Sequence, residues 1–255
     1  MAVVLLFDID GTLVTSGGVA RQALVSGACQ VLGDDAPAAE RVRAAFDFGY
    51  GGMTDRAIVR RGLRQLGVAP SGESAGASER WAAGEAIIDA VLAAYLPRLR
   101  AALAGTPSPL RLLPGAADLV AFARGLPGVV VGLGTGNVRE GARAKLDPFG
   151  LYEAMPFGGF GCDAEAREDL IGAGFRRGAE RLGVPTRAAG LVIVGDTERD
   201  IDAARAHGGL TLGVATGSVD ADALRRHGAE EVAERLDGPA VRAQLTALVA
   251  RARRA

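Results

Sequence analysis

Lysine is nearly absent from this chain. Lys145 is the only lysine among the 29 basic residues, and all the others are arginines. A chain with this bias is expected to use arginine wherever any positive charge is sufficient. A solitary lysine therefore indicates a position that needs a compact point charge, although chance can also leave a single lysine.

Cysteine, long apolar runs and excess charge of one sign are also scarce. Cys29 and Cys162 are too few for a disulfide framework or a zinc cluster, which fits a reducing cytoplasm. No apolar run approaches the roughly 18 residues that span a bilayer, and no basic segment precedes the first apolar run, as it would in a signal peptide. With a net charge of −1, the overall composition gives no indication of nucleic-acid binding. These absences predict a cytoplasmic protein without membrane or nucleic-acid partners.

The pattern of apolar residues predicts two kinds of structure. Residues 3–7 form an apolar run typical of a strand buried on both faces. Helical spacing then dominates until residue 104, with glycine, serine and proline clustered in the breaks, including residues 68–77. The helices are expected at 19–32, 38–47, 54–66 and 79–104. Pro97 is expected to kink or divide the last of them.

From residue 112 onward, short apolar strands alternate with helices, which favours right-handed crossovers and a parallel sheet. Strands are expected at 129–133, 155–160, 191–194 and 210–214, and helices at 114–125, 138–149, 165–182 and 201–207, with two more helices at the end. We therefore predict an α/β fold with a doubly wound, mainly parallel sheet. Residues 1–14 and 110–255 form this core, and residues 15–109 form a helical insert.

Two carboxylates end the first strand. Asp8 and Asp10 flank a single residue and are followed by Gly11 and Thr12. Ligands of open α/β sheets bind beyond the carboxyl ends of the strands. Two carboxylates there attract a divalent cation and offer one anion for attack and one acid for proton donation. The alternative is an ordinary Asp-rich turn or helix cap.

Polar residues end two further strands. Thr135, Gly136 and Asn137 follow the strand at 129–133, where the threonine hydroxyl and backbone N–H groups can cradle an anion or simply cap a helix. Lys145 lies eight residues after Asn137, about two helical turns along, so its side chain can reach back toward the strand ends.

Asp196 and Asp200 follow the strand at 191–194, with a spacing that can place both on one side of a metal, or can merely favour a helix N-terminus. Parallel strands bring their carboxyl ends to one edge of the sheet. That edge would then hold up to four carboxylates, a hydroxyl and the only lysine. Phosphoryl transfer needs such a set: a nucleophile, a proton donor, a cation and donors for the phosphoryl oxygens.

These motifs resemble, in order and context, the four motifs of the haloacid dehalogenase-like superfamily. The residues that carry the resemblance are Asp8-x-Asp10-Gly11-Thr12, Thr135, Lys145 and Gly195-Asp196-x-x-x-Asp200. The helical insert is similar to that superfamily's cap domain of the phosphoglycolate phosphatase type. The resemblance covers essentially the whole chain and is specific for the superfamily, but much less so for the substrate.

The resemblance implies roles for these residues. Asp8 would attack phosphorus to give an aspartyl-phosphate, while Asp10 would protonate the leaving oxygen and later deprotonate water. Mg²⁺ would be held by Asp8, the backbone carbonyl of Asp10 and Asp196, with Asp200 as an additional or outer ligand. The phosphoryl group would be held by Thr135, Gly136, Asn137 and Lys145, and Gly11 and Thr12 would let the loop fold tightly over the site.

The residue inventory narrows this implied activity. Dehalogenases of the superfamily lack the second aspartate, so Asp10 disfavours carbon–halogen cleavage. Phosphonatases need a cap lysine for a Schiff base, and no lysine exists besides Lys145. The expected function is a Mg²⁺-dependent phosphomonoester hydrolase acting on a small phosphorylated metabolite. The alternatives are a sugar phosphomutase and a non-catalytic phosphate-binding or interaction protein.

Substrate choice is expected to come from the cap. Residues 51–56 form a glycine-rich loop in which Thr54 or Arg56 could contact the substrate. The competing interpretation is that Thr54 only caps the helix that follows. The sequence is compatible with either a monomer or a homodimer.

Overall fold

The computed structural model describes residues 2–33, 35–68 and 77–254. The chain divides into two compact units. The first, here called the sheet unit, comprises Met1–Thr15 and Leu110–Ala255, and the second, the helical unit, comprises Ser16–Pro109. The predicted boundaries lie within a residue of these bounds. Each unit is described by itself.

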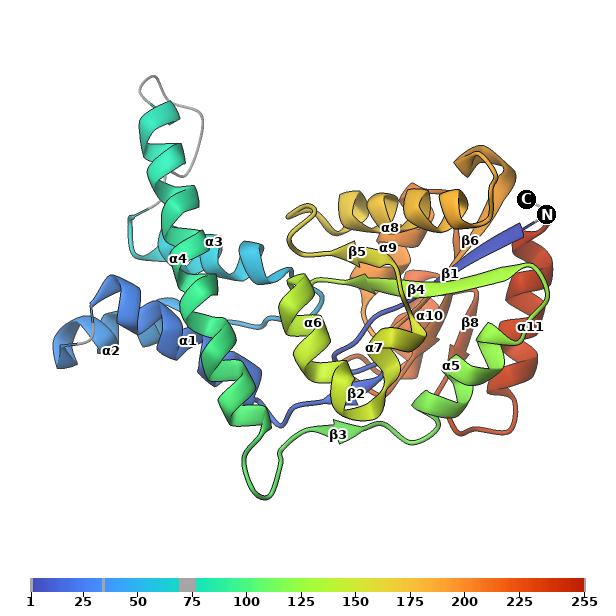
Figure 1. Cartoon of the computed structure of the whole chain (residues 1–255), viewed down its shortest axis with the longest axis horizontal. Helices are drawn as coiled ribbons and strands as arrows, with labels where there is room; N and C mark the ends of the chain where they lie inside the picture. Colours follow the sequence, from blue (N-terminus) through green and yellow to red (C-terminus); the bar gives the residue numbers. More distant parts are fainter. Residues whose placement is uncertain (1, 34, 69–76, 255) are drawn as a thin grey trace. The chain divides into compact units, whose positions relative to one another are not determined.

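A six-stranded parallel sheet forms the centre of the sheet unit, with the strand order β5-β4-β1-β6-β7-β8 (Figure 1). The strands are β1 (Ala2–Phe7), β4 (Val129–Thr135), β5 (Gly158–Phe160), β6 (Ala189–Gly195), β7 (Leu210–Val214) and β8 (Glu231–Ala233). Residues 3–7 of β1 are fully buried because β1 lies between β4 and β6 with helices on both faces. The predicted doubly wound sheet is confirmed.

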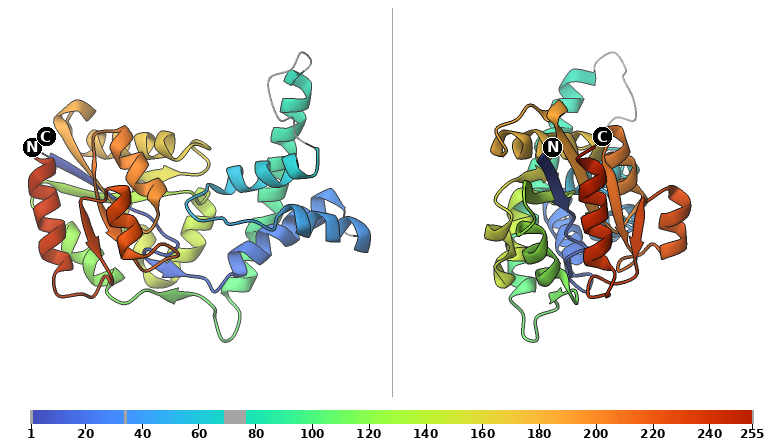
Figure 2. Two further views of the ribbon diagram at one scale, coloured as in Figure 1. Left: turned by 180° about the vertical axis from the view of Figure 1, so that it is seen from behind. Right: turned by 90° about the vertical axis from the view of Figure 1, so that its right-hand side faces the viewer.

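Helices cover both faces of this sheet. They are α5 (Ala116–Arg124), α6 (Arg139–Leu146), α7 (Leu151–Ala154), α8 (Arg167–Arg181), α9 (Glu198–Ala206), α10 (Ala221–His227) and α11 (Val241–Ala252). Helices α8 and α9 pack together on one face, and α5 and α11 pack together on the other (Figure 2). This arrangement leaves the carboxyl ends of the central strands β4, β1 and β6 side by side at one edge.

Glycines let α8 approach the sheet closely. A Cβ atom on Gly159 of β5 would lie 1.7 Å from the carbonyl oxygen of Leu170, and one on Gly178 of α8 would lie 2.4 Å from the side chain of Val4. Side chains larger than hydrogen would therefore force the helix away from the strands. The close packing fixes the start of α8, at Arg167, near the carboxyl edge of the sheet.

The described residues of the helical unit form four helices, close to the predicted ranges: α1 (Val19–Leu32), α2 (Ala36–Ala45), α3 (Asp55–Gln65) and α4 (Ala77–Leu103). Helices α1 and α4 pack at short range, since a Cβ atom on Gly27 would lie 3.0 Å from the backbone nitrogen of Tyr95. The predicted division at Pro97 is wrong, because α4 continues through it. Most of the predicted break at 68–77 lies outside the described residues.

Several short elements differ from the predictions. Strands β2 (Val14–Thr15) and β3 (Arg111–Leu112) pair in an antiparallel two-stranded sheet, and neither these nor β8 were predicted, since two or three residues show no readable period. The helix expected over 138–149 is divided into α6 and a 3₁₀ turn, Asp147–Phe149, because Pro148 has no N–H to continue the helical ladder. No described helix combines the length and apolarity that crossing a bilayer requires.

Candidate active site

Asp8 stands at the end of β1, between the ends of β4 and β6. Its backbone N–H donates to the carbonyl of Val194 on β6 at 2.9 Å, and its residue is only 6% exposed. The guanidinium of Arg167 approaches the carboxylate, with Nη2 3.0 Å from Oδ2. Asp8 is therefore a buried carboxylate held at the sheet edge beside one cation.

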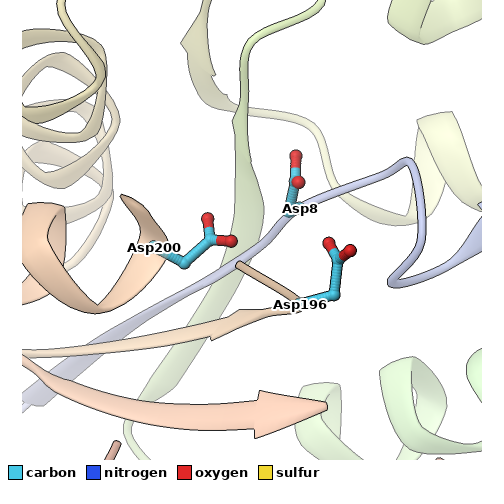
Figure 3. A group of neighbouring side chains, drawn as sticks. All are labelled: Asp8, Asp196 and Asp200. Carbon is cyan, nitrogen blue, oxygen red and sulfur yellow. The ribbon is translucent and has the colours of Figure 1, made fainter. Parts of the chain in front are cut away.

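Two more buried carboxylates lie next to Asp8. Asp196 follows β6 and Asp200 is in the first turn of α9 (Figure 3). One carboxylate oxygen from each of the three aspartates lies within 4.8 Å of the others. Asp8 is therefore next to Asp196 and Asp200 in the structure, although it lies about 190 residues from them in the sequence.

Two glycines lie so close to the carboxylate of Asp196 that a side chain at either position would collide with it. A Cβ atom on Gly217 would lie 1.7 Å from Oδ2 of Asp196, and one on Gly11, where φ is +78°, would lie 2.3 Å from the same oxygen. The hydroxyl of Thr12 donates to Oδ1 at 3.2 Å. Gly11 and Thr12 therefore shape the space around Asp196, and the hydroxyl of Thr216 holds the turn by donating to the carbonyl of Gly11 at 2.6 Å.

Asp200 uses both of its carboxylate oxygens within the protein. The backbone N–H and the hydroxyl of Thr197 donate to Oδ2 at 3.0 and 2.8 Å, and Nε of Arg167 donates to Oδ1 at 3.0 Å. The residue is fully buried. These bonds make Asp200 better suited to anchor Arg167 and the start of α9 than to serve as a first ligand of a metal ion.

Burial dominates the electrostatics of this cluster. Desolvation raises the pKa of Asp8 from 3.8 to about 6, with the attraction of Arg167 working against it. Desolvation and the charge of Asp8 raise the pKa of Asp196 from 3.8 to about 8. Burial lowers the pKa of Arg167, but the charges of Asp200 and Asp8 outweigh it and raise the pKa overall, so the guanidinium stays charged. One guanidinium does not balance three buried carboxylates.

A divalent cation fits this imbalance. The available donors are carboxylate oxygens, which suit a hard cation such as Mg²⁺. Because a bound cation favours ionised ligands, it would counteract the desolvation that raises the pKa values of Asp8 and Asp196. The donor chemistry and the charge of the cluster therefore both match the predicted metal.

The raised pKa values predict that the metal-free protein loses stability as the pH rises. The folded state binds more protons than the unfolded state between pH 3.8 and about 8, so the stabilisation is complete below 3.8 and disappears as Asp8 and Asp196 ionise. Asp196→Asn removes the contribution of Asp196, the larger of the two, and leaves that of Asp8. In urea denaturation with a chelator, we expect it to match wild type near the low end of this range and to exceed it by at least about 2 kcal/mol at the high end. Equal curves at both ends would contradict the prediction.

Asp10 has quite different surroundings. It lies in the tight turn after β1, where its backbone bridges to Val14, and its side chain is 44% exposed. Nζ of Lys145 lies 2.8 and 2.6 Å from its two carboxylate oxygens. Nδ2 of Asn137 donates to Oδ2 at 2.8 Å. The two aspartates that the sequence places together therefore have different cations and different exposure.

The loop after β4 is held in place at the same edge. Thr135 is fully buried, and its hydroxyl oxygen accepts from the backbone N–H of Asn137 at 3.3 Å and from Nδ2 at 2.9 Å. The carbonyl of Asn137 accepts from the N–H of Gly161, and a Cβ atom on Gly161 would lie 2.1 Å from the carbonyl oxygen of Gly136. The structure thus brings residues 135–137 to the edge that carries Asp10.

Arg167 is the site residue that the sequence analysis missed. It occupies the first position of α8, where the partial positive charge of the helix N-terminus disfavours a cation. An arginine at the start of the predicted helix 165–182 was therefore a detectable signal of an external anionic partner. The structure supplies two such partners, Asp8 and Asp200.

The two cap residues have structural partners within the helical unit. Thr54 precedes α3, and its hydroxyl oxygen accepts from the N–H of Ala57 at 3.1 Å. The guanidinium of Arg56 pairs with Glu85 and Asp89 on α4, at 2.5 and 2.6 Å. A substrate contact by Thr54 or Arg56 stays a prediction.

Comparisons with solved structures give the same fold. A predicted phosphatase from Clostridium acetobutylicum is 16% identical, with a TM-score of 0.61 over 97% of this chain and 100% of that one. A predicted phosphoglycolate phosphatase from Haemophilus somnus is 17% identical, with a TM-score of 0.60 over 92% and 95%. A putative beta-phosphoglucomutase from Thermotoga maritima is 17% identical, with a TM-score of 0.54 over 96% and 99%.

Sequence comparison identifies the family. No curated protein sequence matches the chain. A family profile described as "Hydrolase: haloacid dehalogenase-like hydrolase" matches residues 3–208, a range that begins in β1 and includes every carboxylate of the site. The match covers most of the chain, and the sheet with its helical insert is the fold shared with the solved structures. The chain therefore belongs to the haloacid dehalogenase-like hydrolases.

Proposed function

We propose that this protein is a Mg²⁺-dependent phosphomonoester hydrolase that works through an aspartyl-phosphate. The observation that supports the proposal is that two neighbouring carboxylates differ in burial and in the cation they contact. Asp8 is buried among acidic groups beside Arg167, whereas Asp10 is part-exposed and bonded to Lys145. A nucleophile and a proton-transfer group need separate environments of this kind.

In the proposed first step, a carboxylate oxygen of Asp8 attacks phosphorus and the bond from phosphorus to the ester oxygen breaks. Asp10 donates a proton to the departing oxygen, so the alcohol leaves neutral. Arg167 lies beside Asp8 and would offset the negative charge of the incoming phosphoryl group. The backbone and hydroxyl groups of residues 135–137 would hold the phosphoryl oxygens.

In the proposed second step, Asp10 takes a proton from water, and the oxygen of that water attacks the phosphorus of the aspartyl-phosphate. The bond between phosphorus and the Asp8 oxygen breaks, which releases inorganic phosphate and restores the carboxylate. The proton gained by Asp10 serves the next first step.

The metal would be held by Asp8, Asp196 and the backbone carbonyl of Asp10, with Asp200 as an outer ligand through its bonds to Arg167 and Thr197. Bound Mg²⁺ supplies positive charge that offsets the charge of the phosphoryl group and of its carboxylate ligands.

The substrate class we propose is a small phosphorylated metabolite. A cytoplasmic location and the choice between monomer and homodimer stay predictions. A sugar phosphomutase is the second candidate, because the fold is shared with a putative beta-phosphoglucomutase. The chain has no lysine in its helical unit, the kind of basic cap residue on which such mutases usually rely, so hydrolysis is favoured.

The proposal predicts phosphate release that depends on Mg²⁺. A panel of phosphomonoesters that includes phosphoglycolate, nucleotides and sugar phosphates would be incubated with purified protein, with Mg²⁺ or with a chelator. We expect release from at least one ester with Mg²⁺ and a fall of at least about 10²-fold with the chelator, because the site has too little positive charge without the metal.

The other outcomes separate the competing functions. Conversion of a sugar phosphate to its isomer without free phosphate identifies the mutase. Phosphate binding without turnover of any ester identifies a non-catalytic binding protein. Equal release with and without the metal contradicts the assigned role of the acidic cluster.

A further inference from the structure

The loop between β7 and α10 contacts two separate segments of the acidic cluster. Strand β7 pairs in parallel with β6, so the loops that follow the two strands leave the sheet at the same edge. In the loop after β7, the hydroxyl of Thr216 donates to the carbonyl oxygen of Gly11 at 2.6 Å. The next residue, Gly217, borders the carboxylate of Asp196. Two consecutive loop residues therefore touch both the turn after β1 and the aspartate after β6.

Hydrogen bonds hold both peptide groups that flank Gly11. The N–H of Gly11 donates to the carbonyl of Val14 at 2.9 Å. The peptide bond between Asp10 and Gly11 is trans, so the carbonyl of Asp10 points away from that hydrogen bond. Glycine imposes few steric limits on rotation, and here its φ angle is +78°. The bond from Thr216 to the following carbonyl therefore restricts a turn whose rotation would move the carbonyl of Asp10.

Gly217 is required for space and not for its backbone conformation. Its φ angle lies outside the left-handed region that favours glycine, and the residue is exposed. A Cβ atom at this position would nevertheless lie 1.7 Å from Oδ2 of Asp196 and 2.6 Å from its Cγ. The other carboxylate oxygen, Oδ1, accepts from the hydroxyl of Thr12 at 3.2 Å. The backbone of Gly217 and the hydroxyl of Thr12 together fix where the carboxylate of Asp196 lies.

We propose that Thr216 and Gly217 are positioning residues that fix two oxygen ligands of the cation, the carbonyl of Asp10 and the carboxylate of Asp196, and thereby favour Mg²⁺ over Ca²⁺. The proposal rests on the metal site assigned under the proposed function. Mg²⁺ demands nearly octahedral geometry with bonds of about 2.0–2.1 Å, whereas Ca²⁺ accepts flexible arrangements at about 2.3–2.6 Å. Ligands that can shift therefore lose affinity for Mg²⁺ before they lose affinity for Ca²⁺.

The test on Thr216 measures metal binding without substrate. Mg²⁺ and Ca²⁺ would be titrated separately into metal-free protein and followed by calorimetry. Thr216→Val removes the hydroxyl and keeps the shape, so we expect the Kd of Mg²⁺ to rise by about tenfold and that of Ca²⁺ by less than about threefold. Thr216→Ser keeps the hydroxyl and should bind Mg²⁺ within about threefold of wild type. Equal losses for the two cations in Thr216→Val, or no loss for Mg²⁺, would overturn the proposal.

Gly217→Ala tests the space beside Asp196 independently. The added methyl group must displace the carboxylate or the loop that carries it, so we expect the Kd of Mg²⁺ to rise by about 10- to 100-fold. A Gly217→Ala protein that binds Mg²⁺ as tightly as wild type would overturn the role of Gly217. Each of the two variants carries the test if the other does not fold, as judged by thermal unfolding of the metal-free protein.

Matched controls are available for both changes. Ser218→Ala removes an exposed hydroxyl from the same loop and is the control for Thr216→Val. Gly125→Ala is the control for Gly217→Ala, because Gly125 is exposed, has a φ angle of −82° and leaves 3.4 Å between an added Cβ atom and the nearest atom. Both controls should bind Mg²⁺ and Ca²⁺ as wild type does.

Metal binding as the readout separates this inference from the proposed hydrolysis. A wild-type protein that binds Mg²⁺ but releases no phosphate from any ester removes the proposed function, and the losses in the two variants would still support the inference. An active wild type whose Thr216→Val and Gly217→Ala variants bind Mg²⁺ normally removes the inference alone. A wild-type protein that binds no Mg²⁺ removes both.

Discussion

Asp8→Asn is expected to lower phosphate release by at least about 10⁴-fold while the protein stays folded. The amide oxygen is a poor nucleophile and cannot form the aspartyl-phosphate, yet asparagine has nearly the same shape as aspartate. The measurement is kcat on the best ester of the panel with saturating Mg²⁺.

Stability separates a lost nucleophile from a lost fold. Burial raises the pKa of the Asp8 carboxyl group to about 6, which means that its ionised form destabilises the folded state. A neutral amide at this position should therefore leave the metal-free protein equally stable or more stable at neutral pH. Asp118→Asn, an exposed position at the start of α5, is the matched control and should change neither rate nor stability. Wild-type turnover by Asp8→Asn would refute the mechanism, whatever the stability.

Arg167→Met is expected to lower the free energy of unfolding of the metal-free protein by an amount on the order of 3–5 kcal/mol. The guanidinium is 6% exposed and pairs with both Asp8 and Asp200, so its removal leaves two buried carboxylates without their cation. Urea denaturation with a chelator measures the effect. Arg176→Met, on an exposed face of the same helix, should change stability by less than about 0.5 kcal/mol.

A double variant identifies the cause of that loss. Asp200→Asn combined with Arg167→Met removes one of the uncompensated charges while keeping an oxygen that accepts from Thr197. We expect the double variant to regain at least about 1 kcal/mol relative to Arg167→Met alone. If the two losses instead add, Arg167 stabilises the protein by packing and not by its charge.

The sequence predicted that the residues of the candidate site lie close together because the ends of apolar strands are easy to recognise. The apolar runs that precede Asp8, Thr135 and Asp196 have no polar interruption, and the parallel order of their strands follows from the alternating helices. Physical rules for open sheets then bring the ends together. The gathering of acidic residues at the carboxyl ends of the central strands could therefore be predicted from the sequence.

The sequence could not predict which carboxylate each cation of the candidate site contacts. Both cations of the site lie on helices, at Lys145 and Arg167, and their targets depend on how those helices approach the sheet. For α8 that approach depends on close backbone contacts at Gly159 and Gly178, which leave no periodic signal in the sequence. The predicted division of the helix at Pro97 was wrong for a related reason. Tertiary packing can keep a helix continuous through a residue that locally disfavours it.

The paired strands β2 and β3 have a consequence for how this protein could diversify. Thr15 and Arg111 are partners in that two-stranded sheet, so the chain departs from the sheet unit and returns to it at neighbouring positions. Everything between them, residues 16–110, occupies the place of a hairpin loop. Insertions, deletions or wholesale exchange of that segment need not shift the register of β1, β4 or β6. The helical unit, which is expected to determine substrate choice, can thus change in sequence and length. The carboxylates proposed to perform the chemistry would stay in the same positions.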